Sequence, residues 1–333
     1  MKKVISILLV ALMLLGTLAL VSCQKPDEDN TPDTPAAEET LKFGFGFVTS
    51  ASATDATAEE AGAGSVTTTL AVVLVDKDGK IVKSLLDCAD YSVSYNADGT
   101  TLANEEFKTK REQGDNYGMS AIGKTEWYKQ ADAFSKSAEG KTVAEVKALV
   151  AADYKGTADV QAAGCTIYVS DFAKAIEAAV ANAVASDATA SSTLKLGAST
   201  TQTPTNATAE ADGSNELETT FFAAALDKDG KIVAAKSDCL AVAFTFDATG
   251  KSTFDATAEL LTKGQLGNNY GMSAAGKTEW YKQAAAFDSK CIGKKPSEVA
   301  SLMGSDYKGT ADVQTAGCTI YVSGFVKAAT KIG

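Results

Sequence analysis

Histidine is absent from this 333-residue chain, and arginine occurs once, as Arg111. Without an imidazole, the sequence excludes Ser-His-Asp and Cys-His nucleophile activation, ordinary zinc sites and a histidine proton shuttle. A single guanidinium also excludes a set of bidentate arginine clamps on phosphate or carboxylate groups. Any chemistry therefore depends on carboxylates, lysine, tyrosine, cysteine or a bound cofactor.

Positive charge is also scarce, with 31 Lys and Arg against 42 Asp and Glu and a net charge of −11. Such a chain repels phosphates, so we expect no nucleic-acid partner. Hydrophobic residues make up 45% and charged residues 22%, an ordinary globular balance. The length indicates two domains, each large enough to bury a core.

The amino terminus carries an apolar run over residues 4–21 that ends in Leu-Val-Ser-Cys at Cys23. A run of this length can span a bilayer. However, its end resembles the lipobox of bacterial lipoproteins, which implies cleavage after residue 22 and a lipid on Cys23. The mature chain is then anchored to the extracytoplasmic face of the cell membrane. An uncleaved anchor and a plain secretory signal are the alternatives.

Residues 23–40 are acidic and contain three of the chain's five prolines, Pro26, Pro32 and Pro35. The segment has too little apolar surface to build a core. We expect a disordered tether that holds the following domains away from the membrane.

The rest of the chain is a duplication. The segment 116–130 recurs almost unchanged at 269–283, and Asp153-Tyr-Lys-Gly-Thr recurs from Asp306. The two copies span residues 41–186 and 192–333, with a linker at 187–191. A repeat of this length indicates a duplicated domain rather than a solenoid.

Each copy begins with strand signals and continues with helices. In the first copy, residues 67–75 and 81–86 predict a hairpin around an Asp-Gly turn, and residues 91–95 alternate like a further strand. Helices are predicted over 126–139, capped by Thr125, and over 143–151, where Thr142 and Glu145 form a capping box. In the second copy Pro296 begins the latter helix. The fold class is α+β, with an antiparallel sheet and helices packed on one side in each copy.

An aromatic stripe runs along the longer helix of each copy. Trp127 and Phe134 recur as Trp280 and Phe287 at helical spacing. This spacing favours core packing over a platform for a ligand.

A small Gly-Cys-Thr corner follows in both copies, as Gly164-Cys165-Thr166 and Gly317-Cys318-Thr319. Alternating apolar residues predict a strand over 165–169, after which Ser170 caps a helix.

This corner resembles the FMN-binding domain found in the Na+-translocating NADH:quinone reductase, whose motif is Asp-x-x-Ser/Thr-Gly-Ala-Thr. Over most of its mature length the chain also resembles Gram-positive surface lipoproteins that carry two such domains and take part in extracellular electron transfer. The resemblance implies FMN attached by a flavin transferase to Thr166 and Thr319, and a membrane redox donor as partner. Gly164 and Gly317 would let the backbone approach the phosphate.

The motif is degenerate in this chain. Cys165 and Cys318 stand where the family has Ala, and alanines replace its Ser/Thr. Asp159 and Asp312 lie one residue further upstream of the threonine than the Asp of the family motif. Covalent FMN, non-covalent FMN and a tight turn that merely leads into a buried strand are the three interpretations. Tyrosines of the repeated segments either stack on the flavin or pack in the core, and Lys124 and Lys277 either pair with its phosphate or are solvated. These tyrosines are Tyr117, Tyr128, Tyr154, Tyr270, Tyr281 and Tyr307.

The cysteines leave two alternatives open. Beyond Cys23, the pairs Cys88–Cys165 and Cys239–Cys318 would each give one disulfide per copy in an oxidising compartment, with Cys291 left over. Alternatively, all five are buried reduced thiols. Their spacing matches no metal motif.

Two functions of different classes follow. One is a lipid-anchored FMN electron carrier that is not itself an enzyme. The other is a non-redox binding or adhesion lipoprotein built on the same duplicated scaffold. A two-carboxylate hydrolase ranks third, because sequence cannot show two acids in one cleft.

Overall fold

Three long antiparallel strands open each copy. The computed structural model describes residues 38–103 and 106–333, so the predicted signal peptide, Cys23 and most of the tether lie outside the described residues. β-branched and aromatic residues recur along these strands, and such side chains suit a pleated surface. They are β1 (Lys42–Thr54), β2 (Gly62–Val75) and β3 (Ile81–Tyr95), then β6 (Thr193–Thr205), β7 (Gly213–Leu226) and β8 (Ile232–Phe246).

Short strands extend the first sheet only. With β4 (Thr101–Leu102) and β5 (Val184–Ala185) its order is β4-β3-β2-β1-β5, whereas the second sheet is β6-β7-β8. The predicted Asp-Gly hairpin turn is confirmed, with Gly79 at φ 78° and the Asp76 carboxylate accepting from the Lys80 N–H at 2.8 Å. Strand β3 runs unbroken through two segments predicted as separate strands, because its whole length pairs with β2.

Among the described residues, the helices of both copies are short, and only the three longest exceed eight residues. Copy 1 has α1 (Lys110–Gln113), α2 (Trp127–Ala138), α3 (Val143–Lys147), α4 (Ala158–Ala162) and α5 (Ser170–Ala181), and the 3-10 helices η1 (Gly114–Tyr117) and η2 (Met119–Ile122). Copy 2 has α6 (Lys263–Leu266), α7 (Trp280–Cys291), α8 (Ala311–Thr315) and α9 (Ser323–Thr330), and the 3-10 helices η3 (Gly267–Tyr270), η4 (Met272–Ala275) and η5 (Pro296–Leu302).

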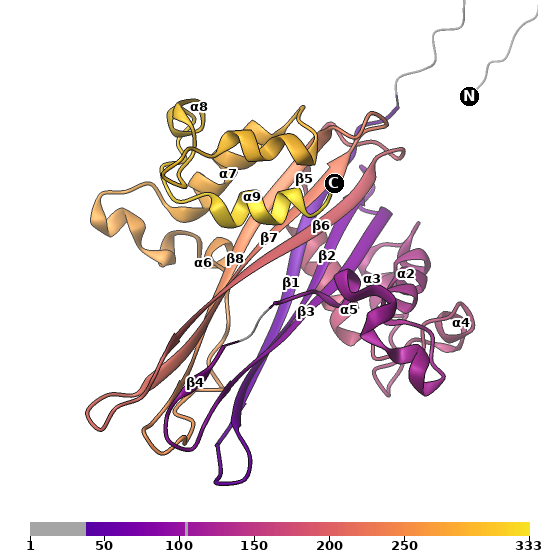
Figure 1. Ribbon diagram of the computed structural model, residues 1–333. Coiled ribbons are helices and arrows are strands. Elements are labelled where there is room, and N and C mark those ends of the chain that lie inside the picture. The colour runs from indigo at the N-terminus through magenta and orange to yellow at the C-terminus, as the bar shows by residue number, and fades with distance from the viewer. Residues whose placement is uncertain (1–37, 104–105) are drawn as a thin grey trace, which may run out of the picture. The chain divides into compact units, whose positions relative to one another are not determined.

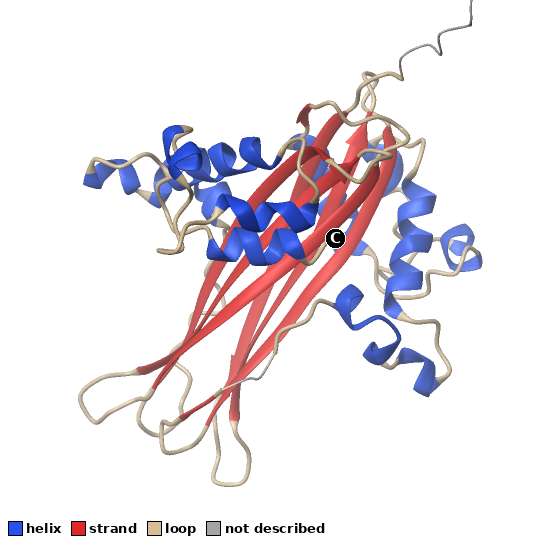
Figure 2. Cartoon of the chain, turned by 45° about the horizontal axis from the view of Figure 1, so that its top comes forward, coloured by secondary structure: helices blue, strands red, loops and turns tan. Residues whose placement is uncertain are grey.

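The layers are helices, sheet, sheet and helices. One apolar cluster joins the facing sides of the two sheets, from Phe45 and Phe47 on β1 to Phe221 on β7 and Phe244 on β8. Two further clusters lie between each sheet and its own helices. Figures 1 and 2 show the strands running together between two groups of helices. The predicted α+β class is confirmed. The face of each sheet that its own helices do not cover packs against the sheet of the other copy.

The far ends of the two sheets are linked reciprocally. Ala56 donates its N–H to the Gly250 carbonyl, and its counterpart Ala207 donates to the Gly99 carbonyl, both at 2.8 Å. The Tyr95 ring at the end of β3 stacks on that of Phe246 at the end of β8, with centroids 4.1 Å apart. The copies therefore form one compact unit over residues 38–333.

The predicted helix starts are partly corrected. Glu126, not Thr125, is the N-cap of α2, and its carboxylate accepts from the N–H groups of Met119 and Ser120 at 3.1 and 2.8 Å. The Thr142 capping box is confirmed, but α3 stops at Lys147, short of the predicted residue 151. In copy 2, Pro296 begins η5 as predicted, although the segment is a 3-10 helix.

The strand predicted over residues 165–169 is wrong. Only an isolated bridge between Lys155 and Tyr168 forms there, matched by Lys308 and Tyr321 in copy 2. The backbone N–H of Cys165 donates to the Val160 carbonyl of α4 at 3.1 Å, and that of Val169 donates to the Tyr154 carbonyl at 2.9 Å. Because these groups are already bonded, the segment has no partner strand, and Ser170 is the first residue of α5 with Val169 as its N-cap.

Across the described part of the chain, we find no helix that combines the length and the hydropathy needed to cross a bilayer.

Candidate functional site

The Gly-Cys-Thr corner is an exposed loop just before α5, and its twin lies just before α9. Gly164 and Gly317 have φ of 106° and 112°, values that side chains with a Cβ rarely adopt. The threonines that follow, Thr166 and Thr319, are exposed. The corner thus places a hydroxyl at the surface on a sharply turned backbone.

Each threonine is held by a glutamine from the long helix of its copy. Gln130 Oε1 on α2 accepts from the Thr166 N–H at 2.8 Å and from its hydroxyl at 3.0 Å. In copy 2, Gln283 accepts from Thr319 at 2.8 and 2.9 Å. Both glutamines are buried, and each Nε2 donates to a backbone carbonyl at 2.7–2.8 Å. The two bonds fix the rotamer of the threonine.

Sequence reasoning missed these glutamines. The signal was present, because Gln130 lies between Trp127, Ala131 and Phe134 on the buried face of α2, and Gln283 repeats the pattern. A polar residue on an apolar helix face needs a buried partner. The aromatic stripe itself packs in the core, as predicted.

A groove of about 600 Å³ adjoins the corner in copy 1. Its volume falls within the roughly 300–1,000 Å³ typical of ligand sites. The lining is largely aromatic and apolar, and the two residues after Thr166 form part of it: Lys110, Tyr117, Gly118, Met119, Ile122, Trp127, Ile167 and Tyr168.

One lysine per copy lies over two of the aromatic rings. Lys110 Nζ lies 5.3 Å from the Tyr117 ring centroid and 6.0 Å from that of Trp127. Lys263 repeats this over Tyr270 and Trp280 at 5.6 and 5.9 Å. Each lysine also pairs with a carboxylate of the sheet, that of Asp90 or Glu218, at 3.0 and 2.8 Å. The groove therefore holds one cation near a stacking surface.

The tyrosines divide between core and surface. Tyr117, Tyr128 and Tyr281 pack partly against the helix–sheet cores. Tyr154 and Tyr307 are 65% and 61% exposed and have φ of 65° and 62°, which is uncommon for any residue but glycine. Tyr168 and Tyr321, beside the corner, are 68% and 67% exposed. Aromatic surface is thus presented next to both threonines.

The five cysteines among the described residues are free, buried thiols, so the disulfide alternative is not what the structure contains. Burial raises the pKa of Cys165 and of Cys318 to about 11, and that of Cys88 and of Cys239 to about 12. A thiol protonated at neutral pH is a poor nucleophile. These residues serve as small core side chains.

The acidic residues of the motif lie on the short helices before the corner. Asp159 on α4 and Asp312 on α8 are exposed, and Asp312 pairs with Lys290 at 2.9 Å. Lys124 and Lys277 are also exposed. Within residues 38–103 and 106–333, no cluster of three or more carboxylate or thiol ligands suited to a metal ion occurs.

Comparison with protein-family models, with curated proteins and with solved structures finds no match to this chain.

Proposed function

We propose that this chain is a lipid-anchored, extracytoplasmic electron-transfer protein that carries one FMN at the Gly-Cys-Thr corner of each copy. The observation that carries the proposal is the pair of exposed hydroxyls, Thr166 and Thr319. Each sits beyond a glycine of positive φ and is held by a buried glutamine.

The residues at the corner suit a flavin in three respects. The hydroxyl is accessible for attachment, and the glycine keeps side-chain bulk away from the turn. In copy 1 the groove beside it offers aromatic faces, which stack on planar rings. FMN would supply the redox chemistry that a chain without histidine does not provide, while the protein would hold and orient it.

The chain's own residues have defined tasks in this proposal. Gln130 and Gln283 orient the threonine hydroxyls, and Tyr168 and Tyr321 flank the bound ring. Lys110 supplies positive charge at the groove, which favours a reduced, anionic ring. A flavin transferase and a membrane redox donor are the proposed partners, and the lipid on Cys23 is the proposed anchor.

The test is an absorption spectrum and an intact mass of the chain produced with a flavin transferase. We expect a yellow protein with roughly 0.4 kDa added per occupied copy, the mass of the cofactor. Thr166→Val and Thr319→Val should each remove one label, and the double variant should remove both. The matched controls Thr157→Val and Thr310→Val should keep both labels, because these hydroxyls make no capping hydrogen bond.

Colourless protein of unchanged mass, combined with failure to take up free FMN, would refute flavin binding. The duplicated scaffold would then be assigned to the non-redox binding function.

A further inference from the structure

The chain's only arginine fills a defined position at the rim between the two sheets. Arg111 on α1 donates from Nε and Nη2 to the Leu86 carbonyl on β3, at 3.0 and 2.9 Å. Its Nη2 also pairs with the Asp132 carboxylate on α2, at 2.7 Å. The guanidinium thus joins the β3 edge of the first sheet to α2.

Copy 2 lacks both members of this ion pair. Glycine (Gly264) stands at the position of Arg111, and alanine (Ala285) at that of Asp132. The surrounding framework is kept, since Thr262 caps α6 and donates to Asp238 as Thr109 does to Asp87. A cavity of about 220 Å³ lies where the guanidinium would be, and both substituted residues line it.

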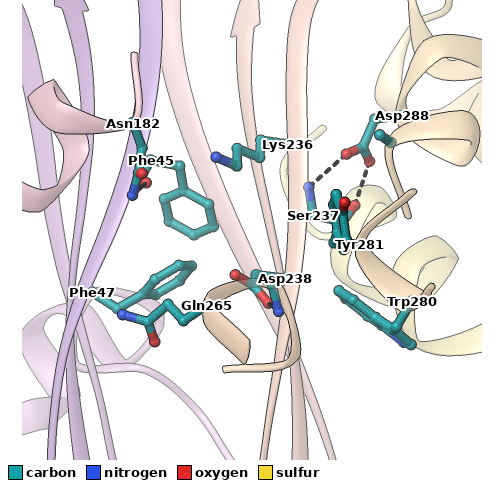
Figure 3. A pocket seen from close by; sticks show the side chains of 12 residues that line it. Phe45, Phe47, Asn182, Lys236, Ser237, Asp238, Gln265, Trp280, Tyr281 and Asp288 are labelled. Atoms are coloured by element: carbon teal, nitrogen blue, oxygen red, sulfur yellow. Dashed lines mark hydrogen bonds between the residues drawn. The ribbon is translucent and has the colours of Figure 1, made fainter. Parts of the chain in front are cut away.

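The cavity wall carries two buried carboxylates (Figure 3). Asp288 on α7 accepts from the Ser237 N–H at 2.9 Å and from its hydroxyl at 2.5 Å. Asp238 accepts from Thr262, Cys239 and Gly264 at 2.7–2.8 Å. Of the described basic side chains, none lies within 4.0 Å of either carboxylate. Buried acids normally have a cationic partner.

The edge carbonyl that holds the guanidinium in copy 1 has a counterpart in copy 2. Ser237 on β8 occupies the position of Leu86 on β3. Its N–H points outward from the sheet to Asp288, and in an extended strand the carbonyl of the same residue points the same way. Copy 2 therefore offers the acceptor that Arg111 uses in copy 1.

The opposite wall is aromatic and belongs to the other sheet. Figure 3 shows Phe45 and Phe47 of β1 facing Asp238 across the cavity, with Trp280 behind it. Aromatic faces favour a planar cation, guanidinium above all. An adjoining groove of about 730 Å³ shares Lys236, Ala285 and Asp288 with the cavity. Apolar side chains of Phe43, Val184, Val233 and Ile292 line this groove.

Lys236 is the one basic residue of the cavity lining. With Asp238 and Asp288 it leaves one negative charge in excess. It lines both the cavity and the apolar groove, and Figure 3 shows its ammonium group directed towards Phe45 rather than towards Asp288. It therefore opposes a second cation in the cavity without pairing with Asp288.

We infer that copy 2 binds a guanidinium group carried on a short aliphatic chain. The guanidinium takes the position that Arg111 occupies in copy 1, between the Ser237 carbonyl, Asp238 and Asp288, against the Phe45 and Phe47 rings. Its aliphatic chain runs into the apolar groove. The source is either a small alkylguanidine or an arginine side chain of a polypeptide.

Calorimetric titration of the purified full chain with butylguanidinium tests the site. We expect saturable binding of one equivalent, at least tenfold tighter than for N-butylurea, the neutral isostere, and tighter than for methylguanidinium. Equally tight binding of N-acetylarginine amide would indicate a polypeptide source, and preference for butylguanidinium a small molecule. No saturable binding of any of these guanidinium compounds would overturn the inference.

Variants locate the site. Asp288→Asn should weaken butylguanidinium binding at least tenfold, whereas Lys236→Met should tighten it by removing a like charge. Gly264→Arg with Ala285→Asp rebuilds the ion pair of copy 1 and should abolish binding. If that variant does not fold, Asp288→Asn carries the test alone, and unchanged affinity there would overturn the site.

The converse exchange opens copy 1. Arg111→Gly with Asp132→Ala should add a second, weaker equivalent, because Ser135 stands there in place of Asp288. If the folded variant still binds only one equivalent, the Arg111 position of copy 1 and the cavity of copy 2 are not equivalent. None of these variants changes a residue of the Gly-Cys-Thr corner, so their outcomes are separable from flavin content.

Discussion

The two copies agree at the Gly-Cys-Thr corner and differ at the rim between the sheets. At the corner, the distances from glutamine to threonine are 2.8 and 3.0 Å in copy 1 and 2.8 and 2.9 Å in copy 2. At the rim, an arginine and aspartate pair in one copy corresponds to a cavity in the other. One backbone thus supports both arrangements.

The difference shows which groups the fold itself requires. At the corner, the threonine N–H needs an acceptor, which the glutamine supplies, and the positive φ before it favours glycine. At the rim, Asp87 and Asp238 keep the same cap contacts whether or not a guanidinium is present. The fold therefore does not require the guanidinium, and the position of Arg111 in copy 1 indicates where a guanidinium would bind in copy 2.

The largest expected effect tests whether the copies are independent. Phe221 is fully buried between the sheets, so Phe221→Ala should lower the free energy of unfolding by about 3–5 kcal/mol. Each copy has one tryptophan, so Trp127→Phe and Trp280→Phe backgrounds report on the copies separately. Because the core is shared, both fluorescence transitions should move together in urea.

The matched control is Tyr168→Ala, which removes a side chain that is 68% exposed and should change stability by less than about 0.5 kcal/mol. A shift confined to the Trp280 transition would mean that the copies unfold as separate domains.

Removing the guanidinium of copy 1 should have the next largest effect. Arg111→Met keeps much of the aliphatic stem but leaves the Leu86 carbonyl without its donor, which costs about 1–3 kcal/mol. Urea unfolding measures it. Lys129→Met, which removes an exposed pair with Asp115, should cost at most about 0.5 kcal/mol. Equal losses in the two variants would show that Arg111 is a surface charge only.

The corners should respond alike. Gln130→Met and Gln283→Met each leave a threonine N–H without its acceptor, at a cost of about 1–2 kcal/mol. Hydrogen exchange of the Thr166 and Thr319 amides should quicken only in the altered copy. An unchanged exchange rate in either variant would contradict the role given to that glutamine.

The smallest expected effect concerns pH. Burial raises the pKa of Asp288 to about 6 from an ordinary 3.8. The native state then binds this proton more tightly than the unfolded chain, so the free energy of unfolding rises as pH falls through 6 towards 4. Between pH 7 and 5 the gain is about 1 kcal/mol.

Asp288→Asn should remove that gain in urea unfolding at the two pH values. Asp87, whose pKa burial also raises to about 6, should retain its own contribution in the variant. Stability that falls between pH 7 and 5 in the original chain would contradict the desolvation of these carboxyls.

Local signals predicted the elements they control. The Asp-Gly hairpin and the Thr142 capping box are confirmed because each depends on contacts a few residues apart. The aromatic stripe is confirmed because its helical spacing marks one face of α2, which packs against α5 and the sheet. The segment from Cys165 to Val169 is not the strand that its alternation predicts. The alternation is real, since Cys165 and Val169 are buried, but their backbone N–H groups donate to the carbonyls of Val160 and Tyr154 rather than to a partner strand.

By itself, the sequence determined the duplication, the α+β class and the repeated corner, because repetition and side-chain periodicity depend only on the order of the residues. Only the tertiary structure decided that the two sheets share one core, that Gln130 and Gln283 hold the threonines, and that a cavity is the counterpart of the lone arginine. Those contacts join residues that lie far apart in the sequence. No local pattern specifies which face of one copy covers the other.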